Sequence, residues 1–158
     1  MATLPQLIEE DVQQLDCILR EYLSRTEALA VLVTDKGGFL IAQQGGNEQF
    51  DTTTIAALAS GAYLANLTIA NLVHETSFDS VYQQGEKFSM FVNNVDEHCL
   101  LVVIFPAPVG VGIVKYYAAS ASQRIAAQLS VAQERDPGAG LDLSALNVAD
   151  TAAFFRKR

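Results

Sequence analysis

The chain has 158 residues, of which 50% are apolar and 18% are charged. This is enough for one domain with a buried core, and it excludes a disordered or low-complexity chain. Ten basic residues against eighteen acidic ones give a formal net charge of −8. Because nucleic-acid binding needs clustered Lys and Arg, this balance argues against DNA or RNA as a partner.

The sequence also bears on the compartment. The first ten residues predict no secretory signal, and the longest unbroken apolar run, residues 99–105, has seven residues. A membrane-spanning helix needs about 20. The two cysteines, Cys17 and Cys99, predict neither a disulfide framework nor a zinc site, so both are expected to be buried thiols. We therefore expect a cytoplasmic protein without stable membrane insertion.

Residues 5–24 predict an amphipathic helix with Pro5 in its first turn. Apolar side chains recur along it at steps of three and four residues and define a buried stripe: Ile8, Val12, Leu15, Leu19 and Tyr22. The carboxylates are assigned to its solvated side: Glu9, Glu10, Asp11, Asp16 and Glu21. An apolar run at 28–34 predicts a buried strand, and Asp-Lys-Gly-Gly at 35–38 turns the chain into a second strand at 39–44.

A second helix is predicted from Asp51 or Thr52, as the cap, to Val73. Apolar residues recur along it at helical spacing: Ile55, Leu58, Ala59, Ala62, Ala65, Ile69 and Leu72. Small residues occupy its other faces, and Gly61 costs a helix interior about 1 kcal/mol relative to alanine. Two interpretations are open. The helix is buried within one chain, or it packs against a second copy of itself.

Three more strands are predicted at 80–84, 88–93 and 98–105, and Pro106 and Pro108 end the last one. A third helix over 110–133 has a buried stripe of four residues: Val114, Ala118, Ala121 and Ile125. The order is helix, two strands, helix, three strands, helix. It predicts an α+β fold in which a five-stranded, mainly antiparallel sheet lies between helices.

The last part of the chain differs in composition from the rest. We expect one domain over residues 1–136, followed at 137–158 by a flexible linker and a tail. The tail is either frayed or a short amphipathic helix that docks Phe154 and Phe155 on a partner.

Motifs for catalysis are missing from the sequence. It contains no GxxxxGK[ST] loop, no GxSxG and no HExxH motif. His74 and His98 fall on different elements and are expected to be structural or surface residues, and Asp96 and Glu97 to be solvated in a turn. We therefore expect no catalytic residue, no cofactor and no metal, and the sequence favours a protein that acts by binding others.

Three segments carry a family resemblance: residues 31–46 (VLVTDKGGFLIAQQGG), residues 51–66 (DTTTIAALASGAYLAN) and residues 100–129. With the order of elements, they resemble the roadblock (dynein light chain) family, and within it the bacterial proteins that activate a Ras-like GTPase in the control of cell polarity and motility. The resemblance covers residues 7–129 and implies the roadblock fold.

The resemblance also implies a homodimer, two protomers of which bind one Ras-like GTPase and reposition its own switch residues. The second helices would pair and the third strands would join two sheets. The implied dimer contacts are Ala59, Gly61, Ala62, Asn66 and Val81. The expected GTPase contacts are Thr54, Ala57, Leu58, Gly61, Ala62, Ala65, Lys115 and Arg124. The alternatives are a scaffold of the same fold that leaves turnover unchanged, and a sensor of small ligands. Concentration at a cell pole is a further expectation.

Overall fold

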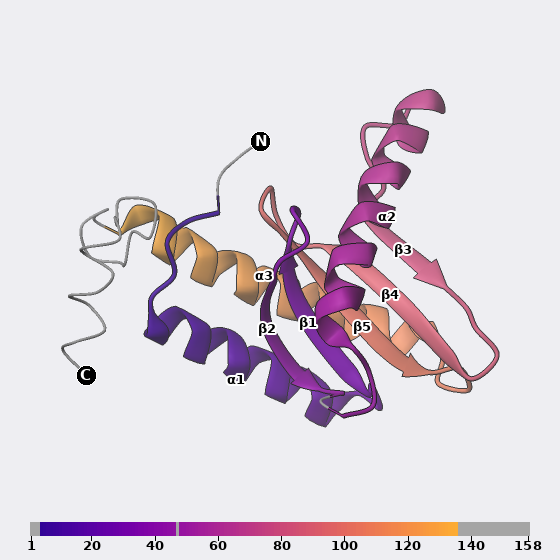
Figure 1. The fold of residues 1–158 in the computed structure, drawn as a ribbon, viewed down its shortest axis with the longest axis horizontal. Helices are drawn as coiled ribbons and strands as arrows, with labels where there is room; N and C mark the ends of the chain where they lie inside the picture. The colour runs from indigo at the N-terminus through magenta and orange to yellow at the C-terminus, as the bar shows by residue number, and fades with distance from the viewer. Residues whose placement is uncertain (1–3, 47, 136–158) are drawn as a thin grey trace.

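The computed structural model describes residues 4–46 and 48–135. Its elements follow the predicted order (Figure 1): α1(Glu9–Arg25), β1(Ala30–Asp35), β2(Leu40–Gly45), α2(Thr52–Leu72), β3(Ser80–Gln83), β4(Phe88–Asn94), β5(Cys99–Pro106) and α3(Val111–Glu134). The predicted linker and tail, with Phe154 and Phe155, lie outside the described residues.

The five strands form one sheet in the order β2-β1-β5-β4-β3. Every strand pairing in the described residues is antiparallel, which confirms the predicted sheet. The central strands β1 and β5 pair in register, with Val33 opposite Leu101, and most of their side chains are buried. The sheet therefore ends in two edges, β2 and β3, and β3 pairs with β4 alone.

Helices cover both faces of the sheet. Helices α1 and α3 pack on one face, where Val31 and Val33 point, and α2 packs on the other, where Leu32 points. This alternation along β1 follows from the twofold period of a strand. The predicted stripe of α3 is confirmed, since Val114, Ala118, Ala121 and Ile125 are all buried.

Helix α1 begins at Glu9, so the prediction that Pro5 lies in its first turn was wrong. Asp11 also departs from expectation, because its side chain is fully buried rather than solvated. Its carboxylate accepts hydrogen bonds from the Arg135 guanidinium at 2.7 and 2.8 Å, from Gln128 at 2.7 Å and from the Ile8 amide at 2.9 Å. These four donors replace the water that a carboxylate would otherwise bind, and they join the two ends of the domain.

The turn between β1 and β2 rests against α2. Gly38 has a φ of +99°, which favours glycine, and a Cβ there would lie 3.1 Å from the Cα of Ala57. The Asp35 carboxylate accepts a hydrogen bond of 2.8 Å from the Phe39 amide, which closes the turn. The predicted turn is thus confirmed, and it contacts the helix that carries most of the predicted binding residues.

Candidate functional site: the exposed face of α2

Helix α2 carries no charged residue along its 21 residues. Asp51 caps its start, because its carboxylate accepts hydrogen bonds from the amide and hydroxyl of Thr54 at 3.1 and 2.7 Å. His74, with a φ of +63°, turns the chain away just after its end. By length and composition, α2 is the one helix among the described residues that could cross a membrane. In the folded protein, 28% of its most apolar stretch is buried.

The buried side of α2 is not the predicted stripe. The side chains against the sheet are mostly small: Thr52, Ala56, Ala59, Ser60, Tyr63 and Ala70. Leu58, Ile69 and Leu72 belong to the predicted stripe, and they are 69%, 48% and 74% exposed. Small residues let a helix lie close to a sheet, and the larger ones are then left facing outward. Burial within one chain therefore does not account for the apolar character of α2.

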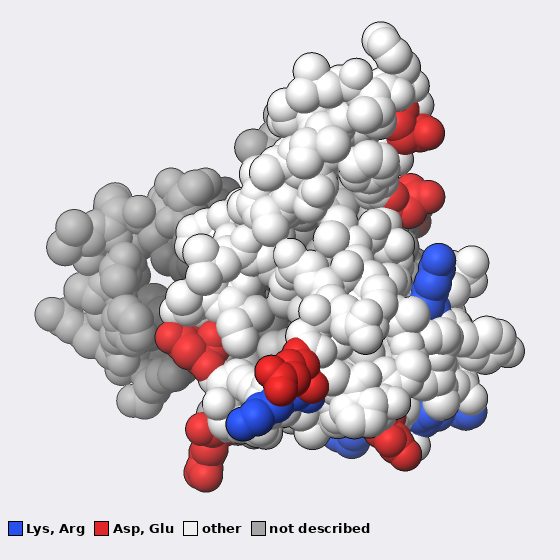
Figure 2. Space-filling model, turned by 90° about the vertical axis from the view of Figure 1, so that its right-hand side faces the viewer, with Lys and Arg blue, Asp and Glu red and all other residues white. Residues whose placement is uncertain are grey.

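Six predicted partner contacts share this outward face, and each is exposed: Thr54, Ala57, Leu58, Gly61, Ala62 and Ala65. We call these six residues the α2 surface. A Cβ on Gly61 would meet nothing within 4 Å, so the protomer itself does not require glycine there. The upper column in Figure 2 is formed by α2, and uncharged residues predominate on it. A contiguous uncharged surface in a chain with a net charge of −8 is typical of a face that contacts another protein, and it is the candidate site.

The other predicted dimer contacts lie in three different settings. Asn66 is half-buried and donates to the Ala62 carbonyl at 3.0 Å. Val81 is half-buried on β3. Ala59 packs into the sheet of its own protomer with Leu32, Val92 and Leu100, and only 3% of it is exposed. Its side chain is therefore closed to a second copy.

The structure does not bring Lys115 and Arg124 to the α2 surface. Both lie on α3, which packs with α1 on the opposite face of the sheet. Arg124 Nη1 lies 2.6 Å from Glu21 Oε2, so this arginine already has an acidic partner in its own protomer. Its hydrogen bond also lowers the pKa of Glu21. A partner that covers the α2 surface would have to pass round an edge of the sheet to reach either residue.

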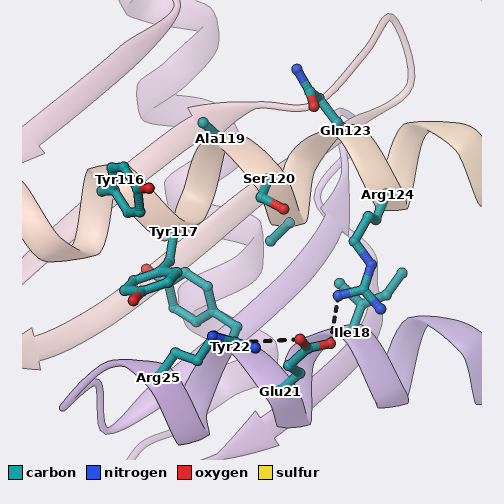
Figure 3. Close-up of a pocket in the computed structure, with 11 residues that line it drawn as sticks. Ile18, Glu21, Tyr22, Arg25, Tyr116, Tyr117, Ala119, Ser120, Gln123 and Arg124 are labelled. Atoms are coloured by element: carbon teal, nitrogen blue, oxygen red, sulfur yellow. Dashed lines mark hydrogen bonds and ion pairs between the residues drawn. The ribbon is translucent and has the colours of Figure 1, made fainter.

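A groove between α1 and α3, with a volume of about 390 Å³, was not foreseen from the sequence. Figure 3 shows Glu21 between Arg25 and Arg124. Tyr116 and Tyr117 lie on the Arg25 side of Glu21. The Arg25 guanidinium lies 6.0 Å from the centre of the Tyr117 ring. The spacing of Glu21 and Arg25 predicts their local pair, but the approach of Arg124 depends on how α1 and α3 pack.

The described residues offer little that could act as a catalytic centre. They contain no group of three or more His, Cys, Asp or Glu side chains that could hold a metal ion. His98 is buried with its Nε2 atom 3.3 Å from Glu97, whereas His74 is exposed at the end of α2. Burial raises the pKa of Cys99 to about 12, which keeps the thiol protonated at neutral pH.

Two smaller expectations also change. Cys17 is exposed on α1, so only Cys99 is the buried thiol that was predicted. Asp96 is not merely solvated, because its carboxylate accepts hydrogen bonds from the amides of His98 and Cys99 at 2.8 and 2.9 Å and shapes the turn before β5.

Residues 15–105 match the family model of the Roadblock/LC7 domain, and the chain belongs to this family. No curated protein matches it significantly. Among solved structures, it is similar to an MglB with a tetrameric arrangement, at 26% identity and a TM-score of 0.77, over 84% of this chain and 99% of that one.

Two further MglB structures are similar to this chain. The gliding protein MglB of Thermus thermophilus is 27% identical with a TM-score of 0.76, over 83% of this chain and 99% of that one. Myxococcus xanthus MglB is 26% identical with a TM-score of 0.76, over 82% and 97%. The chain is thus a roadblock protein whose domain is similar to MglB over nearly the whole of each MglB chain.

Proposed function

We propose that this chain is a homodimeric regulator that binds a small Ras-like GTPase of the MglA type and stimulates its GTP hydrolysis. The observation that carries the proposal is the α2 surface, a helix face that is exposed and uncharged among the residues that the structure describes. Similarity to three MglB structures supports the same assignment.

In this proposal the GTPase supplies the chemistry. A regulator that binds one switch conformation more tightly than another favours it by the difference in affinity. If that conformation holds the attacking water and the phosphates in line, the barrier falls through positioning and electrostatics. Arg124 is engaged by Glu21 on the face opposite the α2 surface, which argues against its use as an inserted arginine. Repositioning of the GTPase's own switch residues is the mode that fits this chain.

The proposed dimer uses the open side of the sheet. Strand β3 is an edge with unpaired backbone groups, which can pair with the same strand of a second copy. That pairing would extend two sheets into one and bring the two α2 helices together on a common face. Two adjacent α2 surfaces then form one site for a single GTPase.

The test is phosphate release by a GTP-loaded MglA-type GTPase with saturating wild-type protein, Gly61→Arg or Val131→Arg. Wild type should accelerate release at least tenfold, a barrier change of about 1.4 kcal/mol. Gly61→Arg places a charged side chain on the α2 surface and should lose the acceleration. Val131→Arg is the matched control, because Val131 is 54% exposed on α3, on the other face.

Two outcomes would contradict parts of the proposal. Binding without acceleration would favour the scaffold of the same fold, which holds a GTPase and leaves its turnover unchanged. Neither binding nor acceleration would remove the GTPase as partner. We further propose a cytoplasmic location, concentrated at a cell pole, in polarity or motility control, and a fluorescent fusion spread evenly through the cell would contradict the polar part.

A further inference from the structure

The groove between α1 and α3 has an aromatic end and a basic end (Figure 3). Tyr116 and Tyr117 lie at the aromatic end, with ring centroids 5.1 Å apart and planes at 89°. Tyr116 is 74% exposed, so its ring is open to a ligand rather than part of the core. Arg124 lies at the basic end, and Ser120 lines the groove between the two. The face of the sheet opposite the α2 surface therefore offers a second place for contact.

The charge of this groove differs from that of the whole chain. Glu21 takes one nitrogen of each arginine, Arg25 Nε at 3.3 Å and Arg124 Nη1 at 2.6 Å. A guanidinium has five N–H donors, and Arg25 and Arg124 are 56% and 48% exposed, so both keep donors for a ligand. Two positive groups and one negative group leave a local charge of +1 on a chain of −8. The groove is thus complementary to a ligand with hydrogen-bond acceptors and negative charge.

The hydroxyl groups of the groove are open as well. The Tyr22 hydroxyl donates to the Val114 carbonyl at 2.9 Å, whereas the hydroxyls of Tyr116, Tyr117 and Ser120 have no such partner within residues 4–46 and 48–135. A polyproline II segment is the complementary ligand, because its carbonyls accept no hydrogen bond within the segment and its prolines have no N–H. An α-helix already satisfies most of its own carbonyls. Proline rings also pack on aromatic side chains, as in other aromatic-lined grooves.

The spacing of the two ends gives the segment a register. From position 116 to position 124 is eight residues of α3, about 12 Å at a rise of 1.5 Å for each residue. A polyproline II segment rises about 3.1 Å for each residue, so about four of its residues span that distance. Prolines against the two tyrosines therefore place a residue about four positions away beside Arg124. An acidic residue there would meet the free donors of the guanidinium.

We propose that the groove between α1 and α3 binds a proline-rich segment of another protein, with its prolines on Tyr116 and Tyr117 and an acidic residue at Arg124. The chain has four prolines, at positions 5, 106, 108 and 137, and none is next to another, so a second copy does not supply the segment. This goes beyond the proposed function, because the groove and the α2 surface lie on opposite faces of the sheet. A partner in the groove leaves the α2 surface uncovered.

The experiment follows the fluorescence anisotropy of a labelled peptide as full-length protein is added. The peptide has about eight prolines and a glutamate at each end, so either direction along the groove is possible. Wild type should bind it. Tyr116→Ala should weaken binding about tenfold or more, because the ring that packs on the prolines is removed. Val131→Ala is the matched control, since this exposed residue of α3 does not line the groove, and it should bind as wild type does. Circular dichroism checks that each variant is folded.

Two further peptides test the chemistry of recognition. Replacing the prolines with alternating glycine and serine should abolish binding, and replacing the glutamates with serine should weaken it several-fold. Arg124→Gln should weaken binding of the glutamate peptide and leave binding of the serine-ended peptide unchanged. Equal weakening of both peptides would show that the acidic residue is not read by Arg124.

Three outcomes would overturn the proposal as a whole. Folded wild type that does not bind the proline peptide would exclude this class of ligand. Equal affinity for the glycine and serine peptide would show that the groove reads charge alone, and unchanged affinity in Tyr116→Ala would place the binding elsewhere on the protein. Each of these results is independent of GTPase stimulation, which phosphate release measures without any peptide.

Discussion

At the residue scale, Asp11 shows how a charged side chain becomes part of the core. Its two carboxylate oxygens meet the planar fork of Arg135, a geometry that adds specificity as well as energy. The Arg135 hydrogen bonds are the main reason that the pKa of Asp11 falls to about 2. A carboxyl whose pKa is lowered by folding stabilises the fold when it is ionised.

Asp11→Asn should therefore destabilise the protein by about 2 kcal/mol at pH 7. The contribution is fully present above about pH 4, where the unfolded carboxyl is ionised, and it is lost as the pH falls towards the folded pKa of about 2. Urea unfolding of wild type and variant across this range should show the difference shrinking. Asp16→Asn on the same helix is the control. A difference that persists unchanged at pH 2 would contradict the role of the ion pair.

Sequence reasoning failed at Asp11 for a physical reason. Its position among Glu9 and Glu10 in the first turn is typical of a solvated, dipole-favoured site, and the residue that buries it lies 124 positions away. Local spacing carries no information about that partner. The reverse holds for the turn at 35–38, because its glycines and aspartate encode their geometry locally, and there the prediction was confirmed.

At the element scale, α2 and α3 differ in what their sequences reveal. In α3 the stripe was predicted correctly, and polar or charged residues such as Lys115, Gln123 and Arg124 lie on its outward side. In α2 both the buried and the exposed faces are apolar or small, so the pattern left open which face meets the sheet. The order of elements and the α2 surface could be predicted, whereas the face of α2 that meets the sheet and the separation of Lys115 from it required the structure.

Gly61 gives the element-scale prediction. Because a Cβ there meets nothing within 4 Å, Gly61→Ala should stabilise the protomer by up to about 1 kcal/mol through helix propensity. If Gly61 lets the backbone of another molecule approach α2 closely, the same change should weaken GTPase binding several-fold. Unfolding in urea at low protein concentration and titration with the GTPase measure the two effects. A variant that gains stability and binds unchanged would mean that no backbone approaches Gly61.

At the scale of the whole molecule, α2 stands apart because it is a long, largely exposed helix without a charged residue. The acidic groups lie outside α2, and the uncharged face continues from the α2 surface to its tip. A net charge far from zero favours solubility, and we expect the uncharged face to carry the contacts of the proposed dimer. The expected association then uses one side of the sheet.

Salt should therefore strengthen self-association. Raising NaCl from about 0.05 M to about 0.3 M screens the repulsion between two acidic copies, since the Debye length falls below about 10 Å. We expect the dimer dissociation constant to fall several-fold, measured by sedimentation at each salt concentration. Ala62→Arg is the reference, because the proposed dimer predicts that this variant is monomeric at every salt concentration. A constant that rises with salt would show that ion pairs hold the dimer together.

The pair of Asp11 and Arg135 also sets where the chain can be shortened. Arg135 directly follows the last residue of α3, so a polypeptide that stops at Arg135 retains the guanidinium, and one that stops at Glu134 leaves an ionised carboxylate sealed in the interior without its counter-charge. We therefore expect a chain cut after Glu134 to be less stable than a chain cut after Arg135.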